Sequence, residues 1–352
     1  MGSIPKGGLL KRLNAKEPII CAEGYLMELD RRGYNTNGIF IPKAVLDNPG
    51  KVEDLTKEFV HAGADACSAF VYYSTRNKLR AAEQGDNFEL LNRRAHEIAK
   101  KVAKETGTLF TSGLTKTGLY DPDDTDSEVL VEQEYREQMA ISAELEVDFI
   151  QIQTLWDYGE ASVALKIAKE YNLPAVITLA PAGPGPMPKT FDGYELKDAL
   201  QRLLDEGAAC VGLNCSRGPK TMIPIFRELR KDIKGPLACV ALGYHTDETA
   251  ETWYRLRSTE TGKMSFPDDI GANYIGNEEA EWYARQLKEI GVEFVGFCCG
   301  NSSTLTRTLA MAYGRNPPAA KYASQVAAKK NVVHGFQIDR YKQKLAEFLG
   351  TL

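Results

Sequence analysis

Short apolar segments alternate with longer amphipathic segments along most of the chain. The apolar segments are rich in β-branched residues and apolar on both faces, which is typical of strands in a parallel sheet that is covered on both sides. Eight such strands are predicted, at residues 18–24, 66–73, 108–114, 148–155, 175–180, 209–215, 237–242 and 294–300.

Helical patterns fill the gaps between the predicted strands. Apolar residues recur with helical spacing at residues 52–62, 128–146, 160–171, 196–206, 221–231, 278–290 and 302–313. In the first of these, Leu55, Phe59 and Ala62 share one face. Glycine often stands between a helix and the next strand, as in HAGAD and EIGVE, which is typical of helix C-caps.

This alternation predicts an α/β fold, a (β/α)8 TIM barrel built from eight strand–helix units. A doubly wound open sheet is the alternative, but it normally carries a glycine-rich phosphate loop after its first strand, and CAEGYLMELDRRG has none. We expect one barrel domain over residues 1–315, with a long insertion at 246–277. Residues 316–352 are predicted to form a C-terminal extension with a short amphipathic helix that contacts another subunit of a homo-oligomer.

Composition narrows the class of protein. The chain has 352 residues, of which 43% are hydrophobic and 26% charged, which is an ordinary globular balance. No segment approaches the roughly 18 apolar residues of a membrane span, and no secretory signal is recognisable. The net charge of −5 disfavours nucleic acid and anionic membranes as partners. Seven cysteines, an odd number, argue against a disulfide framework and favour a reducing cytoplasmic setting.

Three cysteines occupy equivalent places in the predicted barrel. Cys215 ends the sixth strand, and Cys298 and Cys299 end the eighth. The carboxyl ends of barrel strands form the active-site face, so these thiols can meet at one point. Three thiolates with one open position match a catalytic zinc site, whereas packing of buried cysteines is the plainer alternative. Packing is the role expected of the other four, Cys21, Cys67, Cys210 and Cys239.

A zinc ion with three thiolate ligands suits one kind of chemistry. The complex carries a net negative charge and is a poor Lewis acid for carbonyl hydrolysis. A substrate thiol in the fourth position would be deprotonated by the metal and would stay nucleophilic. The expected reaction is alkylation of that sulfur by a small-molecule donor.

The segments GLNCS and GFCCG resemble the GxNC and GGCCG motifs of the homocysteine S-methyltransferase family, with Phe297 in place of a glycine. The resemblance extends from about residue 18 to 315, through LDRRGYNTNGIFIPKAV, AFVYYSTRNKL and LGYHT, and is closest to the betaine-using members. It implies a zinc barrel with Cys215, Cys298 and Cys299 as ligands. It also implies transfer of a methyl group from an onium donor to homocysteine, in methionine biosynthesis.

The resemblance also implies an aromatic pocket for the donor. A quaternary ammonium accepts no hydrogen bonds and binds to aromatic faces. The matching positions are Tyr25, Phe40, Tyr72 and Tyr73, with core packing as the alternative for Phe40. The family tyrosine that matches Tyr73 can occupy the fourth zinc position until the thiol arrives. His245, which follows the seventh strand, is a further candidate for binding a donor carboxylate, or an ordinary loop histidine.

The acceptor side departs from the family pattern. The first-strand motif reads Ala22, Glu23 and Gly24, so that alanine replaces the family aspartate. Ala69 replaces a threonine on the second strand, and Gln153 replaces a glutamate on the fourth. These positions hold the amino-acid end of homocysteine in the family. Glu23 can compensate only through a local bend, since adjacent strand residues point to opposite faces. The alternatives are a thiol acceptor without an amino-acid head, and a non-catalytic barrel that binds zinc or a thiol.

Overall fold

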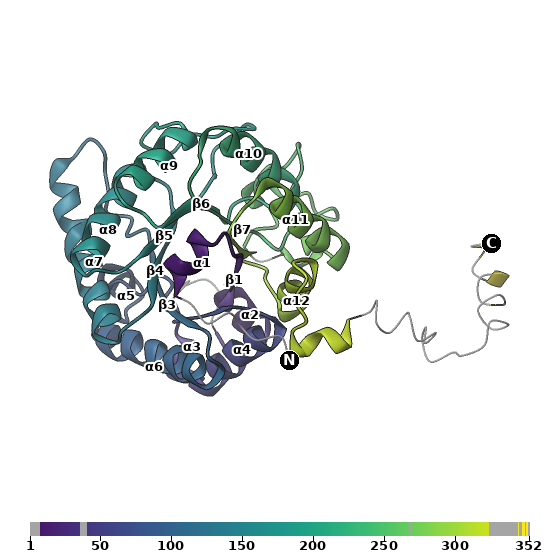
Figure 1. The fold of residues 1–352 in the computed structure, drawn as a ribbon, viewed down its shortest axis with the longest axis horizontal. Helices are drawn as coiled ribbons and strands as arrows, with labels where there is room; N and C mark the ends of the chain where they lie inside the picture. The colour runs from purple at the N-terminus through teal and green to yellow at the C-terminus, as the bar shows by residue number, and fades with distance from the viewer. Residues whose placement is uncertain are drawn as a thin grey trace.

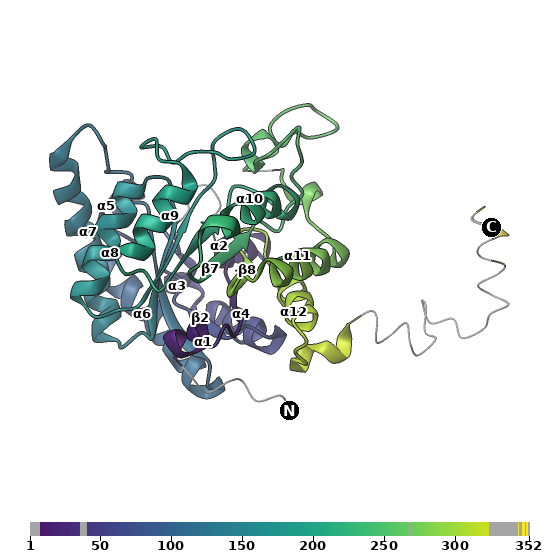
Figure 2. The same cartoon turned by 45° about the horizontal axis from the view of Figure 1, so that its top comes forward.

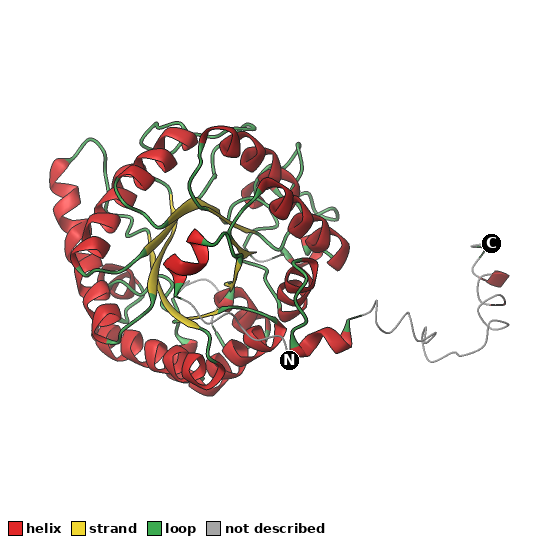
Figure 3. Ribbon diagram, in the orientation of Figure 1, coloured by secondary structure: helices red, strands yellow, loops and turns green. Residues whose placement is uncertain are grey.

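The computed structural model describes residues 8–35, 41–267 and 269–323, and single residues near the C-terminus. Its eight parallel strands form a central barrel surrounded by helices (Figure 1), which confirms the predicted (β/α)8 fold. In the described part of the chain, no helix is long and apolar enough to cross a membrane. Figure 3 shows the strands enclosed by the ring of helices, which covers the outer face of the sheet.

The strands are short and buried, as expected for a sheet covered on both faces. They are β1 (Ile19–Ala22), β2 (Ala66–Ser68), β3 (Leu109–Thr115), β4 (Phe149–Leu155), β5 (Ala175–Leu179), β6 (Cys210–Asn214), β7 (Leu237–Ala241) and β8 (Phe294–Phe297). Cys21, Cys67, Cys210 and Cys239 are all buried, in agreement with their predicted packing role.

The outer helices follow the strands in order. The larger ones are α4 (Pro49–Ala62), α6 (Phe88–Thr106), α7 (Thr125–Glu144), α8 (Tyr158–Glu170), α9 (Leu196–Asp205), α10 (Pro219–Asp232), α11 (Asn277–Ile290) and α12 (Ser303–Ala312). Four shorter helices are α1 (Leu9–Asn14), α2 (Tyr25–Arg31), α3 (Ala44–Asp47) and α5 (Arg76–Ala81). Helix α6 is not among the predicted ranges, although its Leu91, Ala95 and Val102 are buried.

The barrel closes between β1 and β2, which share no ladder. Each strand pairs with its neighbours from β1 through β8 and back to β2. At the remaining seam, the Asp65 amide donates to the Ile20 carbonyl at 2.8 Å, and the Ile20 amide donates to the Asp65 carboxylate at 2.7 Å. Arg12 pairs with the same carboxylate at 3.1 Å. Helix α1, which carries Arg12, lies across the amino-terminal end of the barrel (Figures 1 and 2).

Strands β2 and β8 end at least three residues earlier than predicted, and this places the candidate site in loops. Strand β2 stops at Ser68, because it pairs only with β3, and the chain turns through a positive φ of 53° at Tyr73. Strand β8 stops at Phe297, directly before Cys298. The insertion at 246–277 includes the short turns η2 (Trp253–Arg255) and η3 (Gly271–Asn273) and an isolated antiparallel bridge between Arg257 and Met264. In the C-terminal extension, η4 (Pro318–Tyr322) is described, while most of the predicted amphipathic helix lies outside the described residues.

Candidate active site

The three predicted cysteines converge at the carboxyl end of the barrel. The sulfur atoms of Cys215, Cys298 and Cys299 all lie within 4.8 Å of one another, and those of Cys298 and Cys299 are 3.9 Å apart. Tetrahedral zinc–sulfur bonds of about 2.3 Å place ligand sulfurs about 3.8 Å apart. The arrangement therefore fits a metal ion held by three thiolates, with small adjustments.

A tight turn after β6 presents Cys215. Both Cys215 and Ser216 have a φ of +60°, a left-handed conformation that costs energy for side chains of this kind. The Cys215 amide donates to the Val240 carbonyl at 3.0 Å, and the Arg217 amide donates to the Cys215 carbonyl at 2.7 Å. The buried Arg217 side chain in turn donates to the carbonyls of Pro181, Gly183 and Gly185. The strained turn is thus held by contacts from β7 and from the loop after β5.

Asn214 supports the sulfur cluster from behind. Its side-chain amide donates to Thr154 Oγ1 at 2.7 Å and lies 3.7 Å from Cys298 Sγ, while its oxygen accepts from the Thr154 amide at 2.8 Å. Asn214 is completely buried, so these contacts restrict its orientation. It belongs to the GLNCS motif, but its role depends on contacts with Thr154 of β4, two strands away in the sheet, and is not visible in the motif alone.

The electrostatics of the cluster favour a bound cation. Hydrogen bonds from the Cys298 and Cys299 thiols hold the pKa of Cys215 well below its ordinary value. The same contacts with Cys215, together with burial, raise the pKa values of Cys298 and Cys299. Three adjacent thiolates in a buried site repel one another strongly, and a divalent cation is the usual counter-charge. The donor set, sulfur only and nearly closed to solvent, suits zinc.

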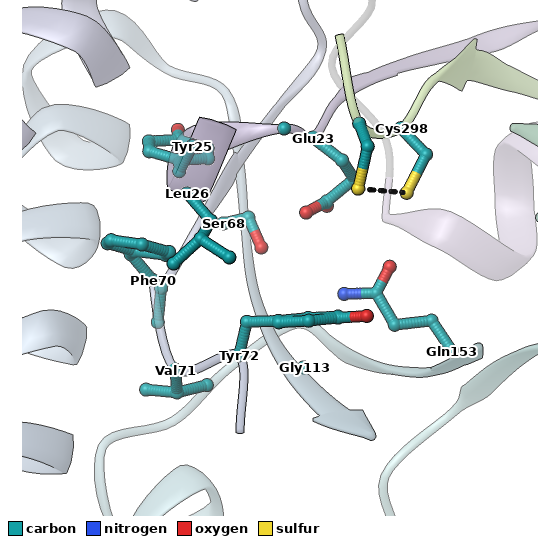
Figure 4. Close-up of a pocket in the computed structure, with 13 residues that line it drawn as sticks. Glu23, Tyr25, Leu26, Ser68, Phe70, Val71, Tyr72, Gly113, Gln153 and Cys298 are labelled. Carbon is teal, nitrogen blue, oxygen red and sulfur yellow. Dashed lines mark hydrogen bonds between the residues drawn. The ribbon is translucent and has the colours of Figure 1, made fainter. Parts of the chain in front are cut away.

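A cavity of about 480 Å³ opens beside the sulfur atoms on the side of β1 and β2 (Figure 4). The residues that line it are Glu23, Gly24, Tyr25, Leu26, Ser68, Ala69, Phe70, Val71, Tyr72, Gly113, Gln153, Cys298 and Cys299. Cys298 and Cys299 form one wall, whereas Cys215 is not part of the lining. Two of the three sulfur atoms therefore border the cavity. Most of the residues that the sequence suggested for acceptor binding also line it.

Glu23 points into this cavity. Strand β1 ends at Ala22 and α2 begins after Gly24, whose φ is +90°, so the local bend that Glu23 requires is present. Figure 4 shows its carboxylate between the cysteine sulfurs and Gln153. The Gln151 amide donates to it at 3.0 Å. Burial, and secondarily Cys298, raises the pKa of Glu23 to about 7.

The other departures from the family pattern surround the same space. Ala69 is buried in the cavity wall, and Gln153 lies at the end of β4 with its amide directed toward Glu23 and Tyr72 (Figure 4). Ala22 is buried but does not line the cavity. Among the residues that line the cavity, Glu23 is the one acidic side chain. It lies next in sequence to Ala22, where the resemblance implies an aspartate.

Tyr72 and Tyr73 lie side by side, with ring centres 4.4 Å apart. Tyr72 lines the cavity and Tyr73 does not, and the cysteine sulfurs contribute to raising the pKa values of both tyrosines. Burial raises the pKa of Tyr73 well above its usual range. Tyr254, in the insertion, was not predicted; burial and, secondarily, Cys215 raise its pKa. No local pattern indicates it, because the insertion has no regular spacing.

The remaining candidates lie in different places. Tyr25 lines the inner part of the cavity, where its ring stacks on Phe70 at 5.6 Å. Phe40 lies outside the described residues. His245 is half exposed, pairs with Glu279 at 2.7 Å, and is not among the residues that line the cavity.

Comparisons with known proteins agree with this geometry. The family model for homocysteine S-methyltransferase matches residues 7–313. Betaine–homocysteine S-methyltransferase 1 of Xenopus tropicalis is 29% identical over 317 residues, 87% of this chain and 75% of the relative. S-methylmethionine–homocysteine S-methyltransferase of Mus musculus is 26% identical over 325 residues, 90% of this chain and 85% of the relative. The metallated homocysteine methyltransferase MmuM from Escherichia coli has the same fold, with a TM-score of 0.68 at 16% identity, over 86% of this chain and 99% of that one.

Proposed function

The chain belongs to the homocysteine S-methyltransferase family, and on this premise we propose that it transfers a methyl group from a betaine-like onium donor to homocysteine, giving methionine, with zinc as its metal. The observation that carries the proposal is the meeting of three cysteine sulfurs within 4.8 Å beside a cavity of about 480 Å³. Cys215, Cys298 and Cys299 would hold the zinc ion. When bound, zinc would favour the deprotonated form of the acceptor thiol.

The cavity supports an amino-acid acceptor. A thiol placed beside Cys298 and Cys299 leaves the rest of its chain in the cavity, where Glu23 offers a carboxylate to an ammonium group. Glu23 has a raised pKa because it is buried, and a bound ammonium would stabilise its charged form. Gln151 and Gln153 orient the carboxylate. Glu23 thus takes the place of the family carboxylates that Ala22 and Gln153 lack.

The donor is assigned to the side of Cys215. Tyr73 and Tyr254 interact with Cys215 there, and their rings can hold the onium group by cation–π contact. In the reaction, the lone pair of the acceptor sulfur forms the new bond to the methyl carbon. The electrons of the broken carbon–nitrogen bond stay on the nitrogen of the neutral amine product, and the thiol proton leaves to solvent. Charge is lost along this path, which a dry site favours over water.

The first test is zinc content together with zinc-edge X-ray absorption, with and without homocysteine. A change from three sulfur ligands and one light atom to four sulfurs would support binding of homocysteine through its thiol. Zinc that stays at three sulfurs would reject homocysteine as the acceptor. Protein purified without any bound metal, and unable to bind added zinc, would reject the metal site.

The matched variants are Cys298→Ser and Cys67→Ser. Cys298→Ser should lose both zinc and turnover, because oxygen is a poor substitute for a thiolate ligand. Cys67 is equally buried, but lies beside Thr108 Oγ1 at 3.2 Å and away from the cluster, so Cys67→Ser should retain zinc and activity. Full activity of Cys298→Ser would end the proposal.

A second acceptor is favoured by one specific observation. The neutral Gln153 and the small Ala69 remove two of the contacts that the family resemblance assigns to the amino-acid end. A thiol without an amino group, such as 3-mercaptopropionate, would then be methylated faster than homocysteine. The carboxylate of Glu23 argues against this acceptor, since it would face a negative or apolar group in a buried space.

A further inference from the structure

Two turns of the candidate site lie against each other, the one that carries Glu23 and the one that carries Cys298. They follow neighbouring strands, since Ala22 at the end of β1 pairs with Phe297 at the end of β8. The Glu23 amide continues this pairing by donating to the Phe297 carbonyl at 3.3 Å. The acidic group of the acceptor cavity and two of the three sulfur atoms therefore come from adjacent segments of the barrel rim.

The two turns are in close backbone contact. Gly24 has a φ of +90°, and a Cβ at this position would lie 2.6 Å from the Cys298 carbonyl oxygen and 3.1 Å from the Asn301 Cβ. A side chain at Gly24 therefore has no room. Because the backbone of one turn packs directly on the other, a shift of either turn displaces its neighbour.

Asn301 joins the two turns by hydrogen bonds. Its side-chain amide donates to the Glu23 carbonyl at 3.0 Å, and its backbone amide donates to the Cys298 carbonyl at 2.9 Å. The Thr306 hydroxyl, on α12, donates to the Asn301 side-chain oxygen at 3.1 Å. Asn301 and Thr306 are both buried. Both ends of the Asn301 amide group have a partner, so its orientation is determined.

This link bears on the direction of the Glu23 side chain. Adjacent residues of a regular strand point to opposite faces, so the carboxylate reaches the cavity only because the chain bends after β1. Asn301 holds the backbone carbonyl of Glu23 at this bend, and Gln151 donates to the Glu23 carboxylate at 3.0 Å. Glu23 is therefore held at its backbone by a residue that follows β8 and at its carboxylate by a residue of β4.

We propose that Asn301 is a positioning residue for acceptor recognition, which sets the distance between the Glu23 carboxylate and the zinc-bound thiol. This inference rests on the proposed function, in which Glu23 binds the ammonium group of homocysteine. In that acceptor three carbon atoms separate the sulfur from the nitrogen, whereas free cysteine has two. A fixed spacing between the two binding groups selects the length of the acceptor, and a loosened spacing reduces that selection.

The test measures homocysteine binding to the zinc-loaded, full-length protein by calorimetry, so that it needs no methyl donor. Asn301→Ala removes the bond to the Glu23 carbonyl but keeps the backbone amide that bonds to Cys298. The dissociation constant for homocysteine should rise about tenfold. The ratio of the dissociation constants for cysteine and homocysteine should fall. Zinc affinity, measured by competition with a chelator, should stay near that of the wild type.

A double-mutant cycle separates this role from a general structural one. If Asn301 acts through Glu23, then Asn301→Ala adds less than about twofold to the loss caused by Glu23→Gln alone. A general structural role would instead multiply the two losses, because the free-energy changes of independent sites add. Multiplied losses, or a homocysteine affinity that Asn301→Ala leaves unchanged, would overturn the inference.

A milder variant covers the case in which Asn301→Ala does not fold. Thr306→Val removes the hydroxyl that orients the Asn301 amide, and the homocysteine dissociation constant should rise about threefold. Thr106→Val is the matched control, because its hydroxyl donates to the Val102 carbonyl at 2.7 Å at the end of α6, which precedes β3 at the opposite end of the barrel.

The control should bind homocysteine like the wild type. Equal effects of Thr306→Val and Thr106→Val would overturn the inference alone. Failure of the zinc-loaded wild type to bind homocysteine would overturn the proposed function, and this inference with it.

Discussion

The Gln151 amide donates a hydrogen bond to the Glu23 carboxylate at 3.0 Å, across the interior of the barrel from β4 to the end of β1. Both side chains are buried, so the contact determines the direction of the one acidic group in the acceptor cavity. This relationship makes Glu23 the most informative residue for acceptor recognition.

Glu23→Gln should weaken homocysteine binding. The substitution removes the charge that faces the ammonium group while preserving size, and loss of one buried ionic partner typically costs a few kcal/mol. The KM for homocysteine should rise by about 10- to 100-fold, with zinc content unchanged. Steady-state kinetics with metal analysis checks this, and Glu260→Gln, at an exposed position, serves as control. An unaltered KM would remove Glu23 from acceptor recognition.

Gly24→Ala should impair the metal site. A Cβ at Gly24 would lie 2.6 Å from the Cys298 carbonyl oxygen, and the residue has a φ of +90°. Relief of the clash must move Cys298, so zinc affinity should fall by about tenfold or more. Gly33 also has a positive φ, of 77°, but has open space around it. Gly33→Ala therefore isolates backbone strain, and equal zinc affinities in the two variants would contradict the prediction.

Asn214→Ala should reduce both stability and zinc affinity. It leaves the buried Thr154 amide without its acceptor and removes the contact with Cys298 Sγ. Such an unpaired buried group costs about 1–3 kcal/mol, and loss of a group that supports a metal ligand typically costs about 10- to 100-fold in affinity. Denaturant unfolding and zinc competition assays measure the two effects. A stability loss with unchanged zinc affinity would restrict Asn214 to a structural role.

Acid should destabilise the protein partly through His96. This side chain is completely buried on α6, with its Nδ1 atom 2.7 Å from the Asn92 carbonyl, and burial lowers its pKa to about 4. The unfolded chain binds the proton more readily, with a pKa of about 6.5. Neutral His96 therefore contributes on the order of 3 kcal/mol to the free energy of unfolding above about pH 6.5. This contribution is lost as the pH falls toward 4.

Urea unfolding at several pH values tests this expectation. The free energy of unfolding should decrease less steeply between pH 6.5 and 4 in His96→Gln than in the wild type, whatever the absolute stability of the variant. His61 is exposed on α4, so His61→Gln should keep the wild-type slope. Identical slopes in all three proteins would show that other groups control acid stability.

The regular part of the fold could be predicted from local patterns. Alternating apolar strands and amphipathic helices specify which face of each element is buried, and eight repeats of that pattern close into a barrel. The positions of Cys215, Cys298 and Cys299 at strand ends then placed the three sulfurs at one face. These conclusions depend only on the spacing of residues along the chain, and the sequence contains all of that information.

Local patterns were less informative where the chain leaves its regular elements. The predicted strand at 66–73 ends at Ser68, because β2 has a ladder partner on one side only. Alternation along a strand could not indicate where Glu23 points, since the bend at Gly24 depends on the close approach of Cys298. Helix α6 was overlooked, although its apolar spacing is present in the sequence.

Only the tertiary structure decided which side chains surround the sulfur cluster and which charges lack a partner. Gln151 meets Glu23 across 128 positions of sequence, and Tyr254 reaches Cys215 from an irregular insertion. Lys78 and Lys116 look like ordinary surface lysines in the sequence. Among the described residues, no carboxylate lies within ion-pair distance of either ammonium group, which becomes visible only in the folded structure. The physical reason is that element type follows from local spacing, whereas the electrostatics of a site sum over residues that meet only after folding.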